Sequence, residues 1–441
     1  MSGRSAGTRV LYRSPGRAYP VAVRAEGAYV WDAQGKRYLD AAAGALVVNV
    51  GHGREDIAQV IATQAARLAF VHGSRFTSAP LEELAERLGE WAPPGRWRFF
   101  ATSGGSEATE SAIKLARQVQ LERGHTEKVE VISRESSYHG ASLGALAASG
   151  MGVRRRPYLP LLNEDAFPKM PKPDPRMPGP EDAARLEELI LERGPERVAA
   201  FVAEPVVGAA NPALAPADGY YEEVRRICDR YEVIYVSDEV MTGLGRTGAR
   251  LGLDHWGVAP DVVVLGKGLA AGYAPLAGIL VAEELAETIE QGSGSFTHGF
   301  TYSGHPVSAA VGVEVLAVLE RERLVERARE TGQYLIAKLR RLADQVPGVT
   351  EVRGRGLLVG VLLGGPDGEP YPRPGYAYAV AEEALSIGLN LYPGTGSADG
   401  DRGDHLLIGP PLTLSRTECD ELVDLLGEAL TRAGERAGGY Q

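Results

Sequence analysis

Residues 233–240 read VIYVSDEV, and residues 261–268 read DVVVLGKG. Each segment is a continuous apolar run, without the alternation of apolar and polar residues that marks a strand with one face in water. Such runs are typical of strands that are buried on both faces of a sheet. In open parallel sheets, ligands bind beyond the carboxyl ends of the strands. The two segments therefore predict a buried sheet that presents Asp238, Glu239 and Lys267 at its carboxyl edge.

Helix-like and strand-like segments alternate along the chain around this pair. Several segments have apolar residues at helical spacing, and short apolar runs lie between them. The alternation predicts an α/β fold with a mostly parallel sheet. The expected strands include residues 96–105, 127–140 and 197–208, and the expected helices include residues 54–70, 80–92, 106–124, 181–194 and 219–231.

The pattern changes after residue 306. Residues 307–345 read as a long helical stretch, and short strand-like runs and a last helix from Arg416 follow it. We therefore expect a large domain and a smaller α+β domain, which also recruits a predicted hairpin over residues 27–41. The expected units are the N-terminal segment 1–53, which contributes to the small domain, the large cofactor-binding domain 54–306, and the C-terminal small domain 307–441.

The composition excludes several classes of protein. The chain has 441 residues, of which 44% are hydrophobic and 24% charged, as in ordinary globular proteins. Its net charge of −11 and the lack of a basic block argue against a nucleic-acid partner. No apolar run approaches the roughly 18 residues of a membrane span, and residues 1–20 lack the apolar core of a secretory signal. Cys228 and Cys419 are too few and too far apart for a disulfide framework or a zinc site. We expect a cytoplasmic protein without a bound metal.

Lys267 is unusual for this chain, because only seven lysines accompany a large number of arginines. One interpretation is that its aliphatic stem packs on apolar surface while the ammonium reaches water. For a lone lysine near a strand end, this interpretation is favoured. The other is a lysine held partly out of water so that its neutral amine can react.

A glycine-rich turn precedes the helix expected over residues 106–124. The turn, Ser103-Gly104-Gly105-Ser106, directly follows a strand. Free N–H groups and the positive end of a helix form an anion site, and glycines let the backbone approach a phosphate closely. The alternative is a helix start without a ligand.

Three other segments are candidates to contact the same ligand. Asp238 ends a buried strand, so it is either salt-bridged or a helix cap, or it keeps a ring nitrogen protonated. Tyr138 and His139 form an aromatic pair that either packs in the core or covers a planar ring. The loop 298–306 is rich in hydroxyl groups and is either an ordinary surface loop or a second phosphate contact.

Two other motifs have weaker interpretations. GLGRTG, residues 243–248, matches the dinucleotide fingerprint, but no helical pattern follows it, so a connecting loop is favoured over a nicotinamide site. RGD at residues 402–404 lacks any extracellular context. The histidines show no metal-ligand spacing.

The first set of motifs supplies a phosphate cup, a strand-end acid, an aromatic cover and a partly desolvated lysine. A planar, phosphorylated aldehyde with a pyridine ring needs these parts. Lys267 would form a Schiff base with the aldehyde, and Asp238 would keep the ring nitrogen protonated so that the ring withdraws electrons. The combination favours pyridoxal 5′-phosphate (PLP) as the cofactor. It also favours a reactive Lys267 over a lysine whose ammonium simply reaches water.

The sequence resembles the class III PLP-dependent aminotransferases of fold type I, from about Tyr19 to Leu430. The separation of Asp238 and Lys267 is also the one that this family uses. The matching segments are SGGSEATESAIKLAR, SYHG, AEPVVG, SDEVMTGLGRTG, LGKGLAAGYAPLAG, HGFTYSGHP and GDHLLIGPPL.

The resemblance implies a role for each matching residue. Lys267 would be the Schiff-base lysine and the base that moves a proton, and Asp238 would pair with the ring nitrogen. The other implied cofactor contacts are Gly105 and Ser106 at the phosphate, Tyr138 on one face of the ring, Val240 on the other face, and Glu204 near the ring hydroxyl, with His139 beside Tyr138. Thr301 would reach the phosphate of the neighbouring subunit, which implies a homodimer.

Within the family, the closest resemblance is to omega-aminotransferases, which include amine:pyruvate enzymes. These move an amino group from an amine or omega-amino acid to a keto acid such as pyruvate, through a pyridoxamine phosphate intermediate. Arg402 matches an arginine that can swing to bind a carboxylate. Leu46 stands where many members carry Trp, which implies a roomier pocket. An aminomutase, decarboxylase or racemase on the same fold is the alternative, and a nicotinamide-dependent dehydrogenase or a non-catalytic scaffold belongs to other classes.

Overall fold

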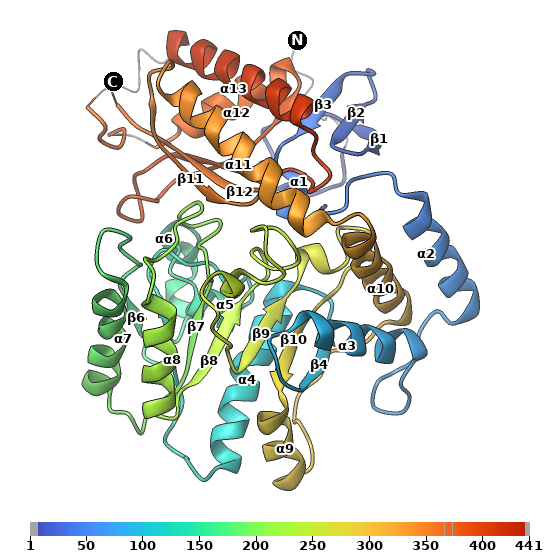
Figure 1. Cartoon of the computed structure of the whole chain (residues 1–441), viewed down its shortest axis with the longest axis vertical. Helices are drawn as coiled ribbons and strands as arrows, with labels where there is room; N and C mark the ends of the chain where they lie inside the picture. The colour runs from blue at the N-terminus through green and yellow to red at the C-terminus, as the bar shows by residue number, and fades with distance from the viewer. Residues whose placement is uncertain (1–7, 366, 373, 437–441) are drawn as a thin grey trace.

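In the computed structural model of the chain, which describes residues 8–365, 367–372 and 374–436, one large sheet lies below two smaller ones in the view of Figure 1. The strand order of the large sheet is β4-β10-β9-β8-β7-β5-β6. These strands are β4 (Trp97–Thr102), β10 (Ala277–Ala282), β9 (Val262–Leu265), β8 (Ile234–Asp238), β7 (Val198–Ala203), β5 (Glu130–Arg134) and β6 (Lys169–Met170).

The large sheet is mostly parallel, as the sequence predicts. The strands from β9 to β6 pair in parallel, whereas β10 is antiparallel to both β9 and β4. β10 is not among the strands expected from the sequence. Its short apolar run, AGILVA, leads directly into the helix that starts at Glu283, and periodicity alone cannot tell such a run from a buried helix segment. The short connection 266–276 favours antiparallel pairing, because a parallel crossover needs about a dozen residues or more.

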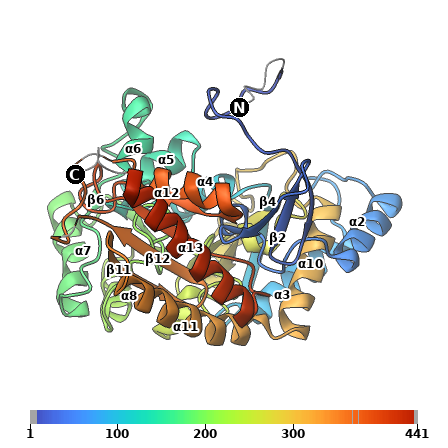
Figure 2. The same ribbon diagram turned by 90° about the horizontal axis from the view of Figure 1, so that it is seen from above.

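The chain after residue 305 forms two helices where the sequence pattern predicts one long helical stretch. α10 (Pro306–Arg321) and α11 (Leu324–Ala343) are separated at Arg323, which has a left-handed φ of 51°. Figure 2 shows α13 between α11 and α12, above the second sheet, whose order is β11-β12-β15-β14. These elements are α12 (Tyr376–Ile387), α13 (Arg416–Arg436), β11 (Val349–Arg355), β12 (Leu358–Leu363), β15 (His405–Ile408) and β14 (Tyr392–Gly394).

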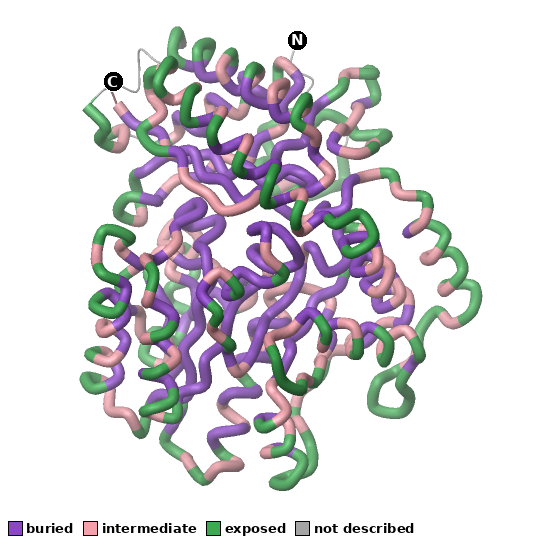
Figure 3. Tube along the Cα trace, viewed as in Figure 1, coloured by how far each residue is buried: buried purple, intermediate pink, exposed green. Residues whose placement is uncertain are grey.

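Both faces of the large sheet are buried, as Figure 3 shows by the purple strands at its centre. Phe201 and Tyr235 belong to a cluster with residues of α7 (Gly179–Arg193) and α8 (Tyr220–Arg230). Neighbouring strand residues such as Ala200 and Val236 join a second cluster with α4 (Gly105–Glu122). The unbroken apolar runs therefore supply both faces of one sheet.

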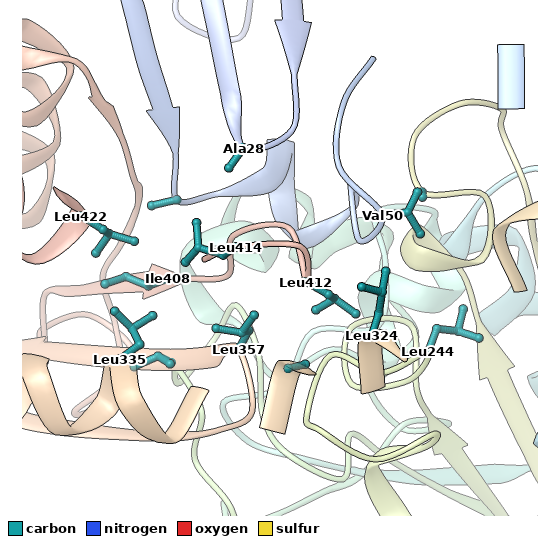
Figure 4. Close-up of a cluster of buried hydrophobic side chains, with 14 of the residues drawn as sticks. Ala28, Val50, Leu244, Leu324, Leu335, Leu357, Ile408, Leu412, Leu414 and Leu422 are labelled. Atoms are coloured by element: carbon teal, nitrogen blue, oxygen red, sulfur yellow. The ribbon is translucent and has the colours of Figure 1, made fainter. Parts of the chain in front are cut away.

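The N-terminal segment lies against the C-terminal part of the chain. The predicted hairpin is present, and its second strand, β3 (Arg37–Asp40), pairs in parallel with β13 (Leu389–Asn390). Figure 4 shows Ala28 in the same buried cluster as Leu412 and Leu414. The domain boundaries at residues 53 and 306 stay a prediction, and the outermost parts of the predicted units, residues 1–7 and 437–441, lie outside the described residues.

Short elements connect these layers. Within the described ranges, no helix combines the length and the apolarity that crossing a bilayer requires. The further strands are β1 (Ala22–Glu26) and β2 (Tyr29–Asp32), and further helices are α1 (Ala43–Leu46), α2 (Glu55–Arg67), α3 (Ala79–Trp91), α5 (Leu143–Ala148), α6 (Gly152–Arg155) and α9 (Glu283–Gln291), with 3-10 turns η1 (Arg156–Leu161), η2 (Gly252–His255) and η3 (Lys267–Leu269).

Candidate active site

Lys267 lies at the carboxyl end of β9, at the start of η3. Its φ of 41° is left-handed, a conformation that non-glycine residues seldom adopt and that surrounding contacts must hold. Gly268 permits such a contact, because a Cβ there would lie 2.3 Å from Asn49 Nδ2. The backbone around Lys267 is therefore held against the N-terminal segment.

The amine of Lys267 is desolvated but reachable. Burial lowers its pKa to about 8, and the carboxylates of Asp238 and Glu204 oppose the shift. The residue stays partly exposed, and its Nζ forms no hydrogen bond with any residue that the structure describes. A share of the amine is therefore unprotonated near neutral pH and free to react.

Asp238 ends the neighbouring strand, β8, and pairs in register with Val264 of β9. Its side chain is buried, and its Oδ2 atom lies 2.7 Å from His139 Nδ1. Its Oδ1 atom accepts a hydrogen bond of 3.0 Å from the backbone N–H of Val240. The other ring nitrogen of His139, Nε2, is buried and has no hydrogen-bond partner among the described residues.

The side chain of Val240 joins the predicted phosphate cup to the lysine. A Cβ at Gly105 would lie 3.2 Å from Val240 Cγ1, and a Cβ at Gly266 would lie 3.3 Å from the same atom. Gly105 starts α4, and Gly266 directly precedes Lys267. Two segments more than 150 residues apart in the sequence thus meet at one apolar contact.

The start of α4 has the form expected of an anion site. Gly104 is its extended N-cap, and no side chain caps the helix. The Oγ atom of Ser106 accepts a hydrogen bond of 2.9 Å from the N–H of Ala141. A Cβ at Gly140 would lie 2.7 Å from that Oγ, so the segment SYHG approaches the helix start closely. Free N–H groups at a helix start attract a phosphate.

Tyr138 and His139 differ in exposure and in the residues that they contact. Tyr138 is partly exposed, and its N–H donates to Glu204 Oε1 over 3.0 Å. Glu204 is buried, accepts a second N–H from Gly208 over 2.9 Å, and has its pKa raised by burial. His139 is also buried and contacts Asp238, so the two rings do not share one open surface as the sequence suggests.

The candidate residues form two layers. The inner layer is buried, and the outer layer is partly exposed, which leaves its side chains open to a ligand. The inner layer contains Glu204, Asp238 and His139, and the outer layer contains Gly105, Ser106, Tyr138, Val240 and Lys267.

The predicted substrate residues differ in their settings. Leu46 is 1% exposed, has a left-handed φ of 59°, and packs against Gly409, where a Cβ would lie 2.3 Å from Leu46 Cγ. Arg402 lies in an exposed loop and forms a 2.8 Å ion pair with Asp399. Thr301 is exposed on the surface of this single chain.

The GLGRTG and RGD motifs have structural roles. Arg246 of GLGRTG is fully buried and donates to Asn49 Oδ1 over 2.7 Å and to the carbonyls of Leu357 and Pro410. Burial lowers its pKa to about 9. Asp404 of RGD accepts N–H groups from Gly375 and Ala377 at the start of α12. One motif thus ties distant segments together, and the other caps a helix.

Sequence reasoning missed two arginines near the site. Arg246 lies in a motif whose glycines draw attention to a dinucleotide site. A lone arginine inside an apolar, glycine-rich loop nevertheless indicates a buried guanidinium with specific partners. Arg154, in the run Arg154-Arg155-Arg156, lies over the ring of Tyr138, with 4.7 Å between the guanidinium carbon and the ring centroid. Nothing in the sequence distinguishes it from its two neighbours.

A model of the aminotransferase class-III family matches residues 13–430. The chain belongs to the class-III aminotransferase family. An uncharacterized aminotransferase of Bacillus subtilis is 40% identical over 94% of this chain and 95% of its own. The putrescine–pyruvate aminotransferase of Pseudomonas aeruginosa is 36% identical over 93% of this chain and 90% of its own. An (S)-enantioselective omega-transaminase from Thermomicrobium roseum has a TM-score of 0.89 and 37% identity, covering 97% of this chain and 96% of its own.

Class-III aminotransferases are PLP-dependent and have fold type I, so the predicted enzyme class, fold and cofactor are confirmed. An amine transaminase from an uncultivated Pseudomonas species, solved in a PLP-bound form, has a TM-score of 0.88 and 33% identity, covering 97% of this chain and 98% of its own. The transamination reaction is shown by the same family assignment.

The residues of this class-III aminotransferase fit PLP. The ring needs an acid for its nitrogen, and Asp238 ends the strand next to the one that leads to Lys267, where His139 Nδ1 and the N–H of Val240 hold its carboxylate. The phosphate needs N–H donors, and α4 starts without a side-chain cap. The aldehyde needs an amine, and Lys267 is free of internal hydrogen bonds among the described residues. Within the same ranges, no group of three or more His, Cys, Asp or Glu side chains is arranged to hold a metal ion.

Proposed function

We propose that this aminotransferase moves an amino group from an amine or omega-amino acid to a keto acid such as pyruvate, with Lys267 as its catalytic residue. The observation that carries the proposal is the meeting of three segments at Val240. Its side chain lies against Gly105 at the start of α4 and against Gly266, which precedes Lys267, and its N–H donates to Asp238 Oδ1. The names of a putrescine–pyruvate aminotransferase and an omega-transaminase among its relatives support this donor and acceptor class.

The outer and inner layers would hold different parts of the cofactor. Gly105 and Ser106 would bind the phosphate through the start of α4. Tyr138 and Val240 would cover the two faces of the ring. Asp238 would pair with the ring nitrogen, His139 would orient that carboxylate through their 2.7 Å contact, and Glu204 would lie near the ring hydroxyl.

PLP, when bound, supplies a ring that withdraws electrons from the substrate Cα and so makes its proton acidic. Lys267 would accept that proton at Nζ and pass it on from the same atom to C4′ of the cofactor, because its pKa of about 8 allows both protonation states near neutral pH. Asp238 would lie opposite the ring nitrogen. The buried inner layer excludes water from the carboxylate of Asp238, which strengthens the electrostatic effect of that carboxylate on the ring.

We also propose a homodimer in which Thr301 contacts the phosphate bound by the partner. Thr301 is exposed, and the adjacent Tyr302 is 60% exposed. The Tyr302 ring lies 5.7 Å from that of Phe70, which is itself 37% exposed. Exposed aromatic surface of this kind favours a protein interface. Cys228 and Cys419 are both free, which supports a cytoplasmic location.

The substrate end would involve Arg402 and Leu46. Arg402 would have to leave Asp399 and swing toward the site to bind a carboxylate. Leu46 is buried in the same cluster as Tyr138, so its size would limit the pocket from that side. Since leucine is smaller than Trp, we expect acceptance of bulkier amines.

Coupled detection of both products tests the proposed reaction. Purified enzyme would be given an amine and pyruvate, and both alanine and the released ketone or aldehyde would be measured. The proposal predicts equal amounts of the two products. Carbon dioxide release, inversion of an amino acid or an internal amino shift without alanine would instead support a decarboxylase, racemase or aminomutase.

A further inference from the structure

Arg154 lies at the rim of the candidate site. Its guanidinium faces the ring of Tyr138 and donates a 3.3 Å hydrogen bond to the hydroxyl of Tyr392. Burial is the main cause of the low pKa of Lys267, and the positive charge of Arg154 acts in the same direction. Arg154 is therefore close enough to interact electrostatically with the reactive amine.

The neighbours of Arg154 provide an internal comparison. Arg155 forms a 2.7 Å ion pair with Glu164, Arg156 pairs with Asp401, and Arg402 pairs with Asp399 over 2.8 Å. Among the residues that the structure describes, no carboxylate lies within ion-pair distance of Arg154. Its contacts are an aromatic ring and a neutral hydroxyl.

A partly buried guanidinium without an anion retains binding capacity. Its planar fork of N–H donors matches a carboxylate, which it binds through two parallel hydrogen bonds. Tyr138 and Tyr392 shield one side of Arg154 from water, and α6 lies beside the loop that carries Arg402, since a Cβ at Gly152 would lie 3.7 Å from the carbonyl oxygen of Gly400. Arg154 and Arg402 therefore lie on neighbouring segments, and Arg402 has a carboxylate partner whereas Arg154 has none among the described residues.

The geometry points to Arg154 as the residue that binds the carboxylate of the keto acid acceptor. This inference rests on the proposed transfer to a keto acid. Arg154 has no carboxylate partner to leave, whereas Arg402, proposed above to bind a carboxylate, could take over this role only after it leaves Asp399. A donor amine without a carboxylate would not use Arg154, so this residue would discriminate between the two substrates of one site.

Steady-state kinetics of the Arg154→Gln holoenzyme test the inference. We expect the KM for pyruvate to rise about 10- to 100-fold, the range of a lost hydrogen-bonded charge pair, while kcat changes little. The KM for butylamine, which has no carboxylate, should stay near its wild-type value. Arg154→Lys keeps the charge without the fork and should show a smaller increase. Arg156→Gln, which removes a paired arginine from the same segment, is the matched control and should leave both KM values unchanged.

A binding measurement separates this inference from the proposed reaction. Isothermal titration of the holoenzyme with propionate, a carboxylate of similar size that lacks the keto group, should show binding that weakens at least about tenfold in Arg154→Gln. Absence of propionate binding in the wild type, or equal binding in the variant, overturns the role of Arg154. So does a pyruvate KM that responds to Arg402→Gln alone, or an equal rise in the KM for butylamine, which would indicate a structural role. If the wild type forms no alanine from pyruvate, the proposed function fails, and the propionate titration still decides the role of Arg154.

Discussion

Two lysines lie at opposite edges of the large sheet, and burial lowers the pKa of both. Lys128 lies before β5, at the amino edge, and is only 4% exposed. Its Nζ donates to the carbonyls of Pro195, Val198, Tyr231 and Glu232, over 3.1, 3.0, 2.7 and 3.3 Å. Lys267 lies after β9, at the carboxyl edge, where its Nζ has no such acceptors within the described chain.

The difference shows that a low pKa by itself does not identify a reactive lysine. The ammonium of Lys128 donates hydrogen bonds to backbone carbonyls of separate segments. It therefore connects these segments and is not available to a ligand. At Lys267 the same desolvation acts on an amine that is partly exposed and has carboxylates nearby. Unsatisfied hydrogen-bonding capacity, together with access, marks the functional edge.

Lys267→Ala should have the largest effect on activity. Loss of the amine removes both the covalent attachment of the cofactor and the proton carrier, so we expect alanine formation to fall by about 10³-fold or more. The visible absorbance of the bound cofactor should shift or vanish. The thermal midpoint should remain close to that of the wild type, because no internal hydrogen bond is lost. Full activity in this variant would remove Lys267 from the mechanism.

Asp238→Asn should lower kcat by about 10²- to 10³-fold, since it replaces the charged partner of the ring nitrogen by a neutral amide. Glu239→Gln is the matched control at the next position. Glu239 accepts N–H groups from Gly252 and Leu253, and burial raises its pKa to about 7. Its replacement should lower stability but leave kcat of the folded enzyme within about threefold, because it holds a loop rather than the cofactor. Equal losses of kcat in both variants would contradict a special role for Asp238.

Lys128→Met should reverse the pattern seen at Lys267. It leaves several carbonyls of the amino edge without their donor, so the free energy of unfolding should fall by about 2 to 4 kcal/mol. Urea denaturation measures this loss. The kcat of the folded fraction should not change, because this edge lies away from the site. A large drop in kcat without a loss of stability would contradict the comparison.

The smallest effect concerns pH. Folding lowers the pKa of Lys267 from its ordinary value of 10.5 to about 8, so between these values the unfolded chain binds more protons than the folded one. The stability of the cofactor-free protein should therefore rise between about pH 8 and pH 10.5, relative to Lys267→Met, by no more than about 1.4 kcal/mol per pH unit. Denaturation of both proteins across this range measures the difference. A difference that stays flat or falls with rising pH would mean that the lysine is not desolvated.

The candidate site could be predicted in large part because its signals are local. Each buried strand shows its apolar run, and Asp238 and Lys267 follow such runs directly. The glycines before α4 likewise indicate that the backbone can approach a ligand closely. β10 was missed because a short apolar run directly before a helix cannot be told from a buried helix segment by periodicity alone. The break at Arg323 was missed because helical periodicity continues on both sides of it.

The sequence by itself determined which residue types follow the buried strands, since apolar periodicity and strand ends are properties of neighbouring residues. The tertiary structure decided which of the polar groups were already satisfied. Lys128 and Lys267 differ in this respect, as do Arg156 and Arg154, and the partners that make the difference come from distant segments. Hydrogen bonds and ion pairs act over a few ångströms in space without regard to separation along the chain, so only folding separates the reactive lysine from the structural one.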